Sequence, residues 1–416
     1  MDVGQILVWS AFYVSLYFIV FWLLTFLEYG ILSPSKPSRK LPFVTIAIPA
    51  WNEEKTIMKT LQSVLDLEYP PEKLDIIVVD DGSKDKTRFL VNQFITEHPS
   101  LSLRLFQQPN GGKGSAMNVA LRHAKGEFFV CLDADSMPAP SALKLMLPYF
   151  TSDNVAVVLP LMKIYEPKTL LQKLQWCEYL LNFFYKSLMA SLNCVHVAPG
   201  PFSVYRKKAL ESVGGFAEKN LTEDFEVTLK LQKKHYQLIQ LFDAVVYTHA
   251  PYTFKAFCKQ RNRWYKGTLL NLFTYRSMIL NKRYGDFGLV QLPRVLLSGF
   301  LAVGFIGFTS YRYVLQPLFK RIGDWSSIHF DFTVFLRHFT FDWSWIDLNY
   351  TNLFFALVSI SLSLFIIRYA YRYTKEKVFR YGFLSVPAYI FAYGLLASFV
   401  WLTVFLDLVR GKRQQW

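Results

Sequence analysis

Hydrophobic positions follow two different patterns along the chain. Between residues 41 and about 253, short apolar runs alternate with longer stretches of helical periodicity, which predicts βα units and a mostly parallel sheet. Outside this part the apolar runs are long enough to cross a bilayer: residues 5–27 precede it, and 287–311, 353–367 and 383–406 follow it. The pattern therefore predicts an α/β domain with one membrane span before it and about three after it.

These patterns divide the chain into four parts. We expect an N-terminal transmembrane helix at 1–33, the α/β domain at 41–253, amphipathic interface helices at 254–284 and a C-terminal membrane region at 285–416. Basic residues directly follow the first span, and the positive-inside tendency then places the domain in the cytosol. This span has no basic start and no small-residue cleavage site, so an uncleaved span is favoured over a signal peptide.

The charge rule leaves the far end of the chain open. Three spans after the domain put the basic loop 368–380 inside, as the rule requires, but they put Arg410, Lys412 and Arg413 outside. The total of four spans, and with it the side of the membrane on which the C-terminus lies, is therefore not determined by the sequence. The aromatic segment 328–350 carries several charges, and we expect it to form an interfacial loop outside.

Composition agrees with a membrane protein. The chain is 52% hydrophobic and carries a formal net charge of +15. Its basic residues cluster beside apolar runs, which favours an anionic membrane surface and phosphorylated substrates over nucleic acid. The four cysteines show neither paired spacing nor a Cys/His cluster, so a disulfide framework or zinc site is not expected and a reducing cytosol fits.

Acidic residues directly follow three predicted strands. The buried run 127–132 ends in Asp133 and Asp135, the strand 74–79 ends in Asp80 and Asp81, and the strand 43–48 leads into the turn Pro49-Ala-Trp-Asn-Glu-Glu54. Open α/β sheets bind ligands at the carboxyl ends of their strands. Paired carboxylates suit Mg²⁺ or Mn²⁺, which would bridge a diphosphate.

Two segments rich in glycine or proline come next. The stretch Asn110-Gly-Gly-Lys-Gly-Ser-Ala-Met-Asn118 offers backbone freedom, the mobile cation of Lys113 and a helix start near Ser115, all suited to an anion. The plainer alternative is a glycine-rich connection with one exposed lysine. The segment 197–206 contains Gly200 and Pro201, and we interpret it as the floor of an acceptor site.

Two further stretches have both a structural and a functional interpretation. Thr222-Glu223-Asp224 opens a predicted helix, where a Thr beside carboxylates is typical of a cap. The functional interpretation requires Asp224 to face a cleft and to accept a proton from a hydroxyl. Residues 254–275 alternate aromatic and basic side chains, which is typical of an amphipathic helix on a membrane surface.

Taken in order, the motifs resemble those of the processive family 2 glycosyltransferases, membrane-integrated synthases of hyaluronan, chitin oligosaccharide, poly-N-acetylglucosamine and cellulose. The resemblance covers residues 43 to about 268, and it implies an α/β GT-A (Rossmann-like) fold for the domain. Six motifs carry it: Pro49-Ala-Trp-Asn-Glu-Glu54, Asp80-Asp-Gly-Ser83, Asn110-Gly-Gly-Lys-Gly114, Asp133-Ala-Asp135, Thr222-Glu-Asp224 and Gln260-Arg-Asn-Arg-Trp264.

The resemblance also implies a role for each motif. Asp224, beside Glu223, would be the general base, and Asp133 and Asp135 would hold the donor and a Mg²⁺ or Mn²⁺ ion. Arg263 and Trp264 would clamp the pyrophosphate and stack on the acceptor sugar, because guanidinium matches phosphate and indole offers an apolar face. The other donor-binding residues would be Pro49, Asn52, Glu53, Asp80, Asp81, Lys113 and Gln260, with Gly200 and Pro201 beside Trp264 at the acceptor.

Three positions depart from the family pattern. Trp51 stands where Tyr is usual, and Gly114 stands where Ala is commoner. Neither departure changes charge or removes a donor. His249 occupies a position where relatives often have Glu, and a satisfied structural histidine is the favoured interpretation.

The favoured function is an inverting, metal-dependent synthase at the cytosolic face of the plasma membrane. It would extend a β-linked polysaccharide, with N-acetylglucosamine the favoured unit, from a UDP-sugar and pass the polymer through its own helices. Alternating glucuronate and an accessory export subunit stay open. The first alternative is transfer of a single sugar to a lipid carrier, against which Arg263 and Trp264 speak; the second is a non-enzymatic membrane protein with an inactive domain.

Overall fold

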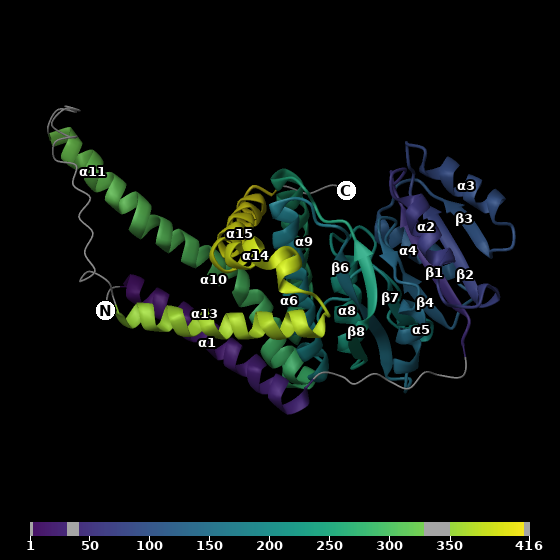
Figure 1. Ribbon diagram of the computed structural model, residues 1–416, viewed down its shortest axis with the longest axis horizontal. Helices are drawn as coiled ribbons and strands as arrows, with labels where there is room; N and C mark the ends of the chain where they lie inside the picture. Colours follow the sequence, from purple (N-terminus) through teal and green to yellow (C-terminus); the bar gives the residue numbers. More distant parts are fainter. Residues whose placement is uncertain (1–2, 31–40, 328–349, 412–416) are drawn as a thin grey trace.

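The computed structural model describes residues 3–30, 41–327 and 350–411. Figure 1 shows an α/β domain at one end of the molecule and long helices at the other, with the N-terminus among the helices. In this view the domain meets the helical region along one side. The expected outer loop at 328–350 lies outside the described residues except for Tyr350, as do Lys412 and Arg413.

The domain is built on one eight-stranded sheet whose spatial order is β3-β2-β1-β4-β7-β6-β8-β5. The first half is parallel, because β1 pairs with β2 and β4, and β2 pairs with β3, all in the same direction. The strands are β1 (Val44–Ala50), β2 (Leu74–Asp80), β3 (Leu103–Gln107), β4 (Phe128–Cys131), β5 (Met137–Pro138), β6 (Val155–Ile164), β7 (Ser203–Arg206) and β8 (Gln237–Thr248).

The prediction of a mostly parallel sheet is wrong for the second half. There β7 runs antiparallel to both β4 and β6, and β5 runs antiparallel to β8, while β6 and β8 are parallel. The reversal comes from the short strand β7, which ends the Pro/Gly segment and enters the sheet between β4 and β6 in the direction opposite to both. A strand of four residues at the end of a turn-rich segment gives little periodic signal.

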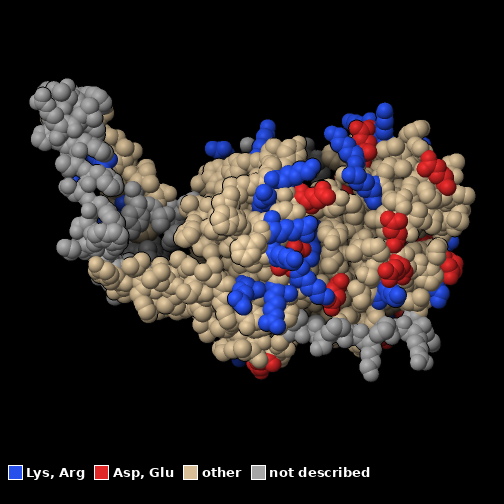
Figure 2. Space-filling view, in the orientation of Figure 1, with Lys and Arg blue, Asp and Glu red and all other residues tan. Residues whose placement is uncertain are grey.

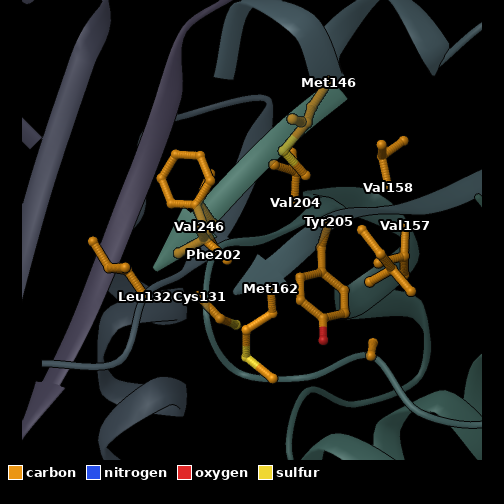
Figure 3. Close-up of a cluster of buried hydrophobic side chains, with 14 of the residues drawn as sticks. Cys131, Leu132, Met146, Val157, Val158, Met162, Phe202, Val204, Tyr205 and Val246 are labelled. Carbon is orange, nitrogen blue, oxygen red and sulfur yellow. The ribbon is translucent and has the colours of Figure 1, made fainter. Parts of the chain in front are cut away.

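The strands form the core because they are apolar on both faces. All seven residues of β2 and all ten of β6 are buried, and the run predicted as a buried strand is buried throughout β4. Figure 3 shows part of this core, where Cys131 of β4, Tyr205 of β7, Met162 of β6 and Val246 of β8 lie close together. A continuous apolar sheet thus fixes the strand ends that carry the acidic turns.

Helices cover the sheet close to where the sequence places them. α4 packs on β1 and β2, and α6 packs on β6 and β8. The glycine-rich segment turns into α4 at Lys113, two residues before the predicted start. The domain helices are α2 (Ile57–Leu65), α3 (Thr87–Glu97), α4 (Lys113–His123), α5 (Ala142–Met146), α7 (Lys207–Ser212) and α8 (Glu223–Lys233), with the short turns η1 (Pro71–Lys73) and η2 (Leu147–Tyr149).

Two long helices join the sheet to the helical region. α6 (Leu170–Ser191) begins with a reciprocal cap between Thr169 and Gln172, and α9 (Phe254–Thr274) begins where the Thr253 hydroxyl accepts from the Ala256 amide at 3.3 Å. Both helices contact elements on each side of the junction. The short turns η3 (Arg276–Met278) and η4 (Lys282–Tyr284) then lead away from α9.

Four helical segments among the described residues are long and apolar enough to cross a membrane, by length and composition: Phe12–Tyr29, Phe287–Gly304, Leu353–Tyr373 and Val378–Val409. Their number agrees with the predicted spans. They lie in α1 (Val3–Tyr29), η5 (Phe287–Gln291), α10 (Leu292–Ser310), α13 (Tyr350–Tyr373), α14 (Val378–Ala388), η8 (Tyr389–Tyr393) and α15 (Gly394–Val409); η6 (Tyr311–Leu315) and α11 (Gln316–Ser327) follow α10.

Charge on the surface follows this division. Figure 2 shows Lys and Arg gathered in a band between the helical region and the sheet domain, while the visible helical surface beyond the band is nearly free of charge. Basic residues at the border of an apolar helical region are typical of the cytosolic membrane face. The band agrees with the predicted orientation, which stays a prediction.

Candidate active site

One large cavity joins the sheet domain to the helices. Its volume is about 1010 Å³, and it runs from the carboxyl ends of β1, β2 and β4 past α8 and α9 to α1, α10 and the C-terminal helix. Most residues selected from the sequence line it. These are Pro49, Glu53, Asp81, Lys113, Asp133, Asp135, Gly200, Pro201, Glu223, Asp224, Gln260, Arg263 and Trp264.

Asn52 and Asp80 do not line the cavity. The Asn52 side-chain oxygen accepts from the Lys84 amide at 2.8 Å, and the Asn52 amide donates to the Ser83 hydroxyl at 3.0 Å. Asp80 accepts from the Ser83 amide at 3.0 Å. Asn52 has a φ of 56°, a left-handed conformation that Asn tolerates better than most residues. Asn52 therefore ties the first acidic turn to the second, while Asp80 stabilises its own turn.

Asp81 fixes the glycine-rich loop. Its carboxylate accepts from the Gln108 side-chain amide at 2.6 Å and from the Gly111 and Gly112 amides at 2.8 and 2.9 Å. Gly112 has a φ of 85°, which a side chain would strain. Asp81 thus holds the loop against β2 while its own edge faces the cavity.

Lys113 is held at the centre of the carboxylates. Its ammonium forms an ion pair with Asp133 and lies 3.5 Å from Glu223 Oε1. Burial lowers the pKa of Lys113, but the Asp133 and Glu223 carboxylates outweigh that effect and raise it. The alternative of a merely exposed lysine is therefore wrong.

Gly200 leaves the space in which this ion pair sits. A Cβ at Gly200 would come within 2.2 Å of the Lys113 ammonium and 2.6 Å of Asp133 Oδ1. No side chain larger than hydrogen fits there without displacing the pair. The segment before β7 thus closes over the Lys113–Asp133 pair, which agrees with its predicted place at the site.

The two carboxylates predicted to bind metal are crowded. Burial and the neighbouring Asp133 raise the pKa of Asp135, and burial together with Asp135 and Asp133 raises the pKa of Glu53 to about 7. Among the described residues there is no cluster of three His, Cys, Asp or Glu able to hold a metal by itself. Mg²⁺ commonly takes one or two carboxylates and completes its shell with substrate phosphates and water, so Asp133 and Asp135 fit such an ion.

The capping explanation for Thr222 is wrong. Its side chain makes no cap hydrogen bond to α8 and instead accepts from the Asn271 side chain of α9 at 3.0 Å. Asp224 accepts from the Phe225 amide at 2.8 Å and lines the cavity. The start of α8 is therefore tied to α9, and Asp224 faces the space between the donor-side carboxylates and the helices.

The motif on α9 contains a residue that the sequence did not single out. Arg261 is 1% exposed, its guanidinium donates to Glu178 of α6 at 2.6 Å, and it lies 4.2 Å from the ring centroid of Trp264. The interpretation of α9 as only a basic surface helix is wrong for this face. The sequence feature that could have pointed to a buried partner for Arg261 was Glu178, one acidic residue in an aromatic helix pattern.

His249 differs from its favoured interpretation as a satisfied structural histidine. Its side chain is exposed toward the cavity, and no hydrogen bond to it is found within the described ranges. Its ring lies edge-on to Tyr165 at 5.8 Å, and its charge lowers the pKa of Asp135 against the effect of burial. His249 therefore belongs to the surroundings of the proposed metal ligands.

The comparisons with known proteins agree with this geometry. Residues 45–214 match the family described as "Glycosyl transferase family 2". The beta-monoglucosyldiacylglycerol synthase of Trichormus variabilis is 32% identical over 247 residues, which is 59% of this chain but only 53% of that protein. The poly-beta-1,6-N-acetyl-D-glucosamine synthase of Staphylococcus epidermidis is 26% identical over 82% of this chain and 78% of its own length.

A solved structure shows the same fold. The mannosyltransferase PcManGT from Pyrobaculum calidifontis, in complex with GDP-Man and Mn²⁺, superposes with a TM-score of 0.56 at 23% identity and covers 66% of this chain and 75% of its own. The predicted GT-A fold and glycosyltransferase class are confirmed at the level of the domain. Residues 45–214, less than half of the chain, are thus similar to the glycosyl transferase family 2.

Proposed function

We propose that the chain transfers hexosyl groups from a UDP-sugar and polymerises a β-linked, N-acetylglucosamine-containing polysaccharide. The observation that carries the proposal is the single cavity that joins the carboxylate-lined strand ends to the helical region. A donor bound at one end and an acceptor entering from the other would meet at Asp224. Similarity to a poly-N-acetylglucosamine synthase over most of both chains supports the product class.

The chemistry follows from the charges around the meeting point. The acceptor hydroxyl attacks the anomeric carbon of the donor sugar, Asp224 takes the hydroxyl proton, and the bond to the diphosphate breaks with its electron pair leaving on the nucleotide. Attack from the face opposite the leaving group inverts the anomeric configuration. A divalent cation, when bound by Asp133 and Asp135, would supply positive charge beside the leaving diphosphate.

Three groups of this chain would position the reactants. Lys113, paired with Asp133, lies where a diphosphate would need a second cation. Trp264, held against Arg261, offers a rigid aromatic face for an acceptor sugar. The aromatic residues Tyr393 and Trp401 continue the cavity wall along the C-terminal helix, which suits passage of a polymer. We propose a plasma-membrane protein with the domain on the cytosolic side.

The second candidate is transfer of a single sugar to a lipid. It is favoured by the 32% identical relative, which is named as a beta-monoglucosyldiacylglycerol synthase. It is also favoured by the apolar side chains of α1 and α10 in the cavity wall, among them Ile19 and Val295. Both candidates share the donor site and differ in the product.

Product analysis of purified protein distinguishes them. The protein in proteoliposomes with Mg²⁺ or Mn²⁺ receives radiolabelled UDP-N-acetylglucosamine, UDP-glucose, UDP-glucuronate or UDP-galactose, singly and in pairs. Polymer that a matching glycosidase digests supports the synthase, and a mono-glycosylated lipid as sole product contradicts it. Absence of UDP release with every donor, in a preparation that binds UDP, would contradict both.

A further inference from the structure

Three nitrogen-bearing side chains line the helical end of the cavity. They are Lys186 of α6, His196 of the segment before β7, and Arg294 of α10, and we call them the cation pocket. They come from three elements that are far apart in the sequence. None of the six motifs includes them, and the proposed transfer step does not use them.

A buried glutamine orients two members of the pocket. Gln291 is 0% exposed; its side-chain oxygen accepts from Arg294 Nε at 3.2 Å, and its side-chain nitrogen donates to His196 Nδ1 at 2.8 Å. His196 therefore carries its proton on Nε2, away from Gln291. Within the part of the chain that the structure describes, no hydrogen bond occupies the terminal nitrogens of Arg294 or the Nε2–H of His196, so both can donate to a ligand.

Lys186 adds a charge that makes no ion pair with a carboxylate within the described ranges. Lys186 is 8% exposed, and its ammonium lies 4.6 Å from the ring centroid of Phe183. Burial lowers the pKa of Lys186 to about 8, against the opposing influence of Asp224. Burial and the charges of Arg294 and Lys186 lower the pKa of His196. A buried cation without a paired anion is costly unless a ligand supplies the charge.

The surroundings of the pocket identify the kind of anion. The Arg294 guanidinium lies 6.0 Å from the ring of Trp22 in α1, and both residues belong to segments able to span a membrane. The apolar side chains of Ile19, Val295 and Ala302 continue the cavity wall along the same two helices. Basic pockets between membrane helices near the cytosolic face are typical sites for anionic lipid headgroups.

We infer that the cation pocket binds the phosphate of an anionic phospholipid that acts as the acceptor, with a headgroup hydroxyl at Asp224 and acyl chains along α1 and α10. The inference rests on the second candidate function, transfer of a sugar to a lipid, because it makes a lipid the acceptor at Asp224. The headgroup oxygen bonds to the anomeric carbon, its proton passes to Asp224, and the nucleoside diphosphate leaves with the electron pair. An acidic polysaccharide is disfavoured because the wall beyond the cations is apolar.

The test compares two lipids that share a free hydroxyl and differ in phosphate. Purified protein in phosphatidylcholine nanodiscs containing either phosphatidylglycerol or diacylglycerol receives radiolabelled UDP-sugar, and label on each lipid is measured. We expect phosphatidylglycerol to be preferred by about tenfold or more, and Lys186→Gln to reduce this preference by about tenfold. Lys173→Gln, the same change on the same helix but outside the cavity, should keep the preference.

The preference is a ratio, so partial loss of folded protein lowers both transfers alike and leaves it unchanged. Equal transfer to the two lipids, or a preference that Lys186→Gln leaves intact, overturns the inference while the proposed function stands. Lack of label on any lipid or polymer, together with lack of UDP release, overturns the proposed function instead. Label only on an added uronate-containing oligosaccharide, lost in Lys186→Gln, would assign the pocket to an acidic polymer and reject the lipid.

A measurement of lipid binding tests the cation pocket without requiring glycosyl transfer. Native mass spectrometry of the detergent-solubilised protein should show phosphatidylglycerol retained in preference to phosphatidylcholine. Arg294→Gln should lose this preference and Arg294→Lys should keep part of it, because the lysine retains the charge but not the planar fork. Equal retention of both lipids by the unmodified protein would contradict the pocket.

Discussion

The two ends of the cavity are built in opposite ways. At the sheet end, side chains such as Asp81, Lys113 and Asp133 are held by partners from neighbouring loops before any ligand arrives. At the helical end, Lys186 and Arg294 present charge without a paired carboxylate among the described residues. A preorganised end suits a donor that is the same in every cycle, whereas an end with unmatched charge is completed by its ligand.

The two ends of the cavity also differ in how their residues are brought together: by local sequence at the sheet end and by long-range packing at the helical end. The sheet-end residues sit in turns that directly follow strands, so their spacing is short and recognisable. The helical-end residues are brought together only when α1, α6 and α10 pack against one another. The following predictions test each end, beginning at the point where the two meet.

Asp224→Asn should give the largest loss of activity. The amide cannot take the acceptor proton, and a general base typically contributes about 10²–10⁴-fold. Donor contacts at the sheet end stay in place, so UDP-sugar binding should change little. UDP release and calorimetric donor binding measure the two effects on the same preparation.

Asp153→Asn is a matched control for Asp224→Asn, because the Asp153 side chain is fully exposed and does not line the cavity. It should behave like the unmodified protein. Near-normal turnover in Asp224→Asn would refute the assignment of the base. A parallel loss of donor binding would instead place Asp224 with the sheet end.

Removal of the metal, or of one of its predicted protein ligands, should give the next largest loss of function. Chelation should stop UDP release, and added Mg²⁺ or Mn²⁺ should restore it. Asp135→Ala should weaken metal-dependent donor binding by roughly hundredfold, since a metal contributes several kcal/mol of charge stabilisation. Donor binding that is unchanged in Asp135→Ala would show that the metal, if used, lies elsewhere.

Much of the sheet end could be predicted from the sequence. The parallel strands β1, β2 and β4 and their acidic turns follow from apolar runs and turn residues, and they lie where predicted. What could not be predicted there is which polar side chains face the ligand. Asn52 bonds to the neighbouring turn and Asp80 bonds within its own turn, and neither lines the cavity. For Asn52 that choice depends on contacts 31 or 32 residues apart.

Gly200→Ala should damage the sheet end without changing any charge. The added methyl would overlap the Lys113 ammonium and Asp133 Oδ1, so the ion pair must move. Misplacement by about an ångström commonly costs up to roughly hundredfold in rate, and we expect a loss between about tenfold and hundredfold in kcat/KM. Steady-state kinetics would measure it, and an unchanged kcat/KM would mean that the pair adjusts freely.

Glu178→Gln tests the support of Trp264. It leaves the buried Arg261 charge unpaired, which typically costs roughly 3–5 kcal/mol of stability. A shifted guanidinium should also release Trp264, for a loss of about tenfold in kcat/KM for the acceptor. Thermal unfolding and acceptor kinetics give the two values.

A double variant separates the two effects of this ion pair. Glu178→Met with Arg261→Met replaces both charges by apolar side chains and should regain much of the stability. Acceptor KM should stay high, because Trp264 still lacks its guanidinium partner. Full recovery of both properties would mean that the pair serves folding alone.

The helical end shows why some features escape prediction. Arg294 stands as a charge inside the apolar run 287–311, but nothing in the sequence links it to Lys186 or to His196, which lie 108 and 98 positions away. Their meeting depends on how α6 and α10 pack. The antiparallel strand β7 escaped for a related reason, because its partners β4 and β6 come from distant parts of the chain.

Gly114→Ala should have the smallest effect. Whether it raises or lowers the stability of the protein distinguishes helix propensity from packing. Alanine is the commoner residue at this place in the family that the motifs resemble, and it is the better helix former, so propensity alone predicts a gain in stability. Here a Cβ at Gly114 would lie 2.4 Å from the Ala217 carbonyl oxygen, so overpacking should cost roughly 1–3 kcal/mol instead. Gly304→Ala is the matched control, because a Cβ on that helical glycine of α10 meets nothing within 4 Å. A lower unfolding midpoint for Gly114→Ala alone would show that the sheet end is fixed by packing against the segment after α7; equal midpoints would mean that this segment yields.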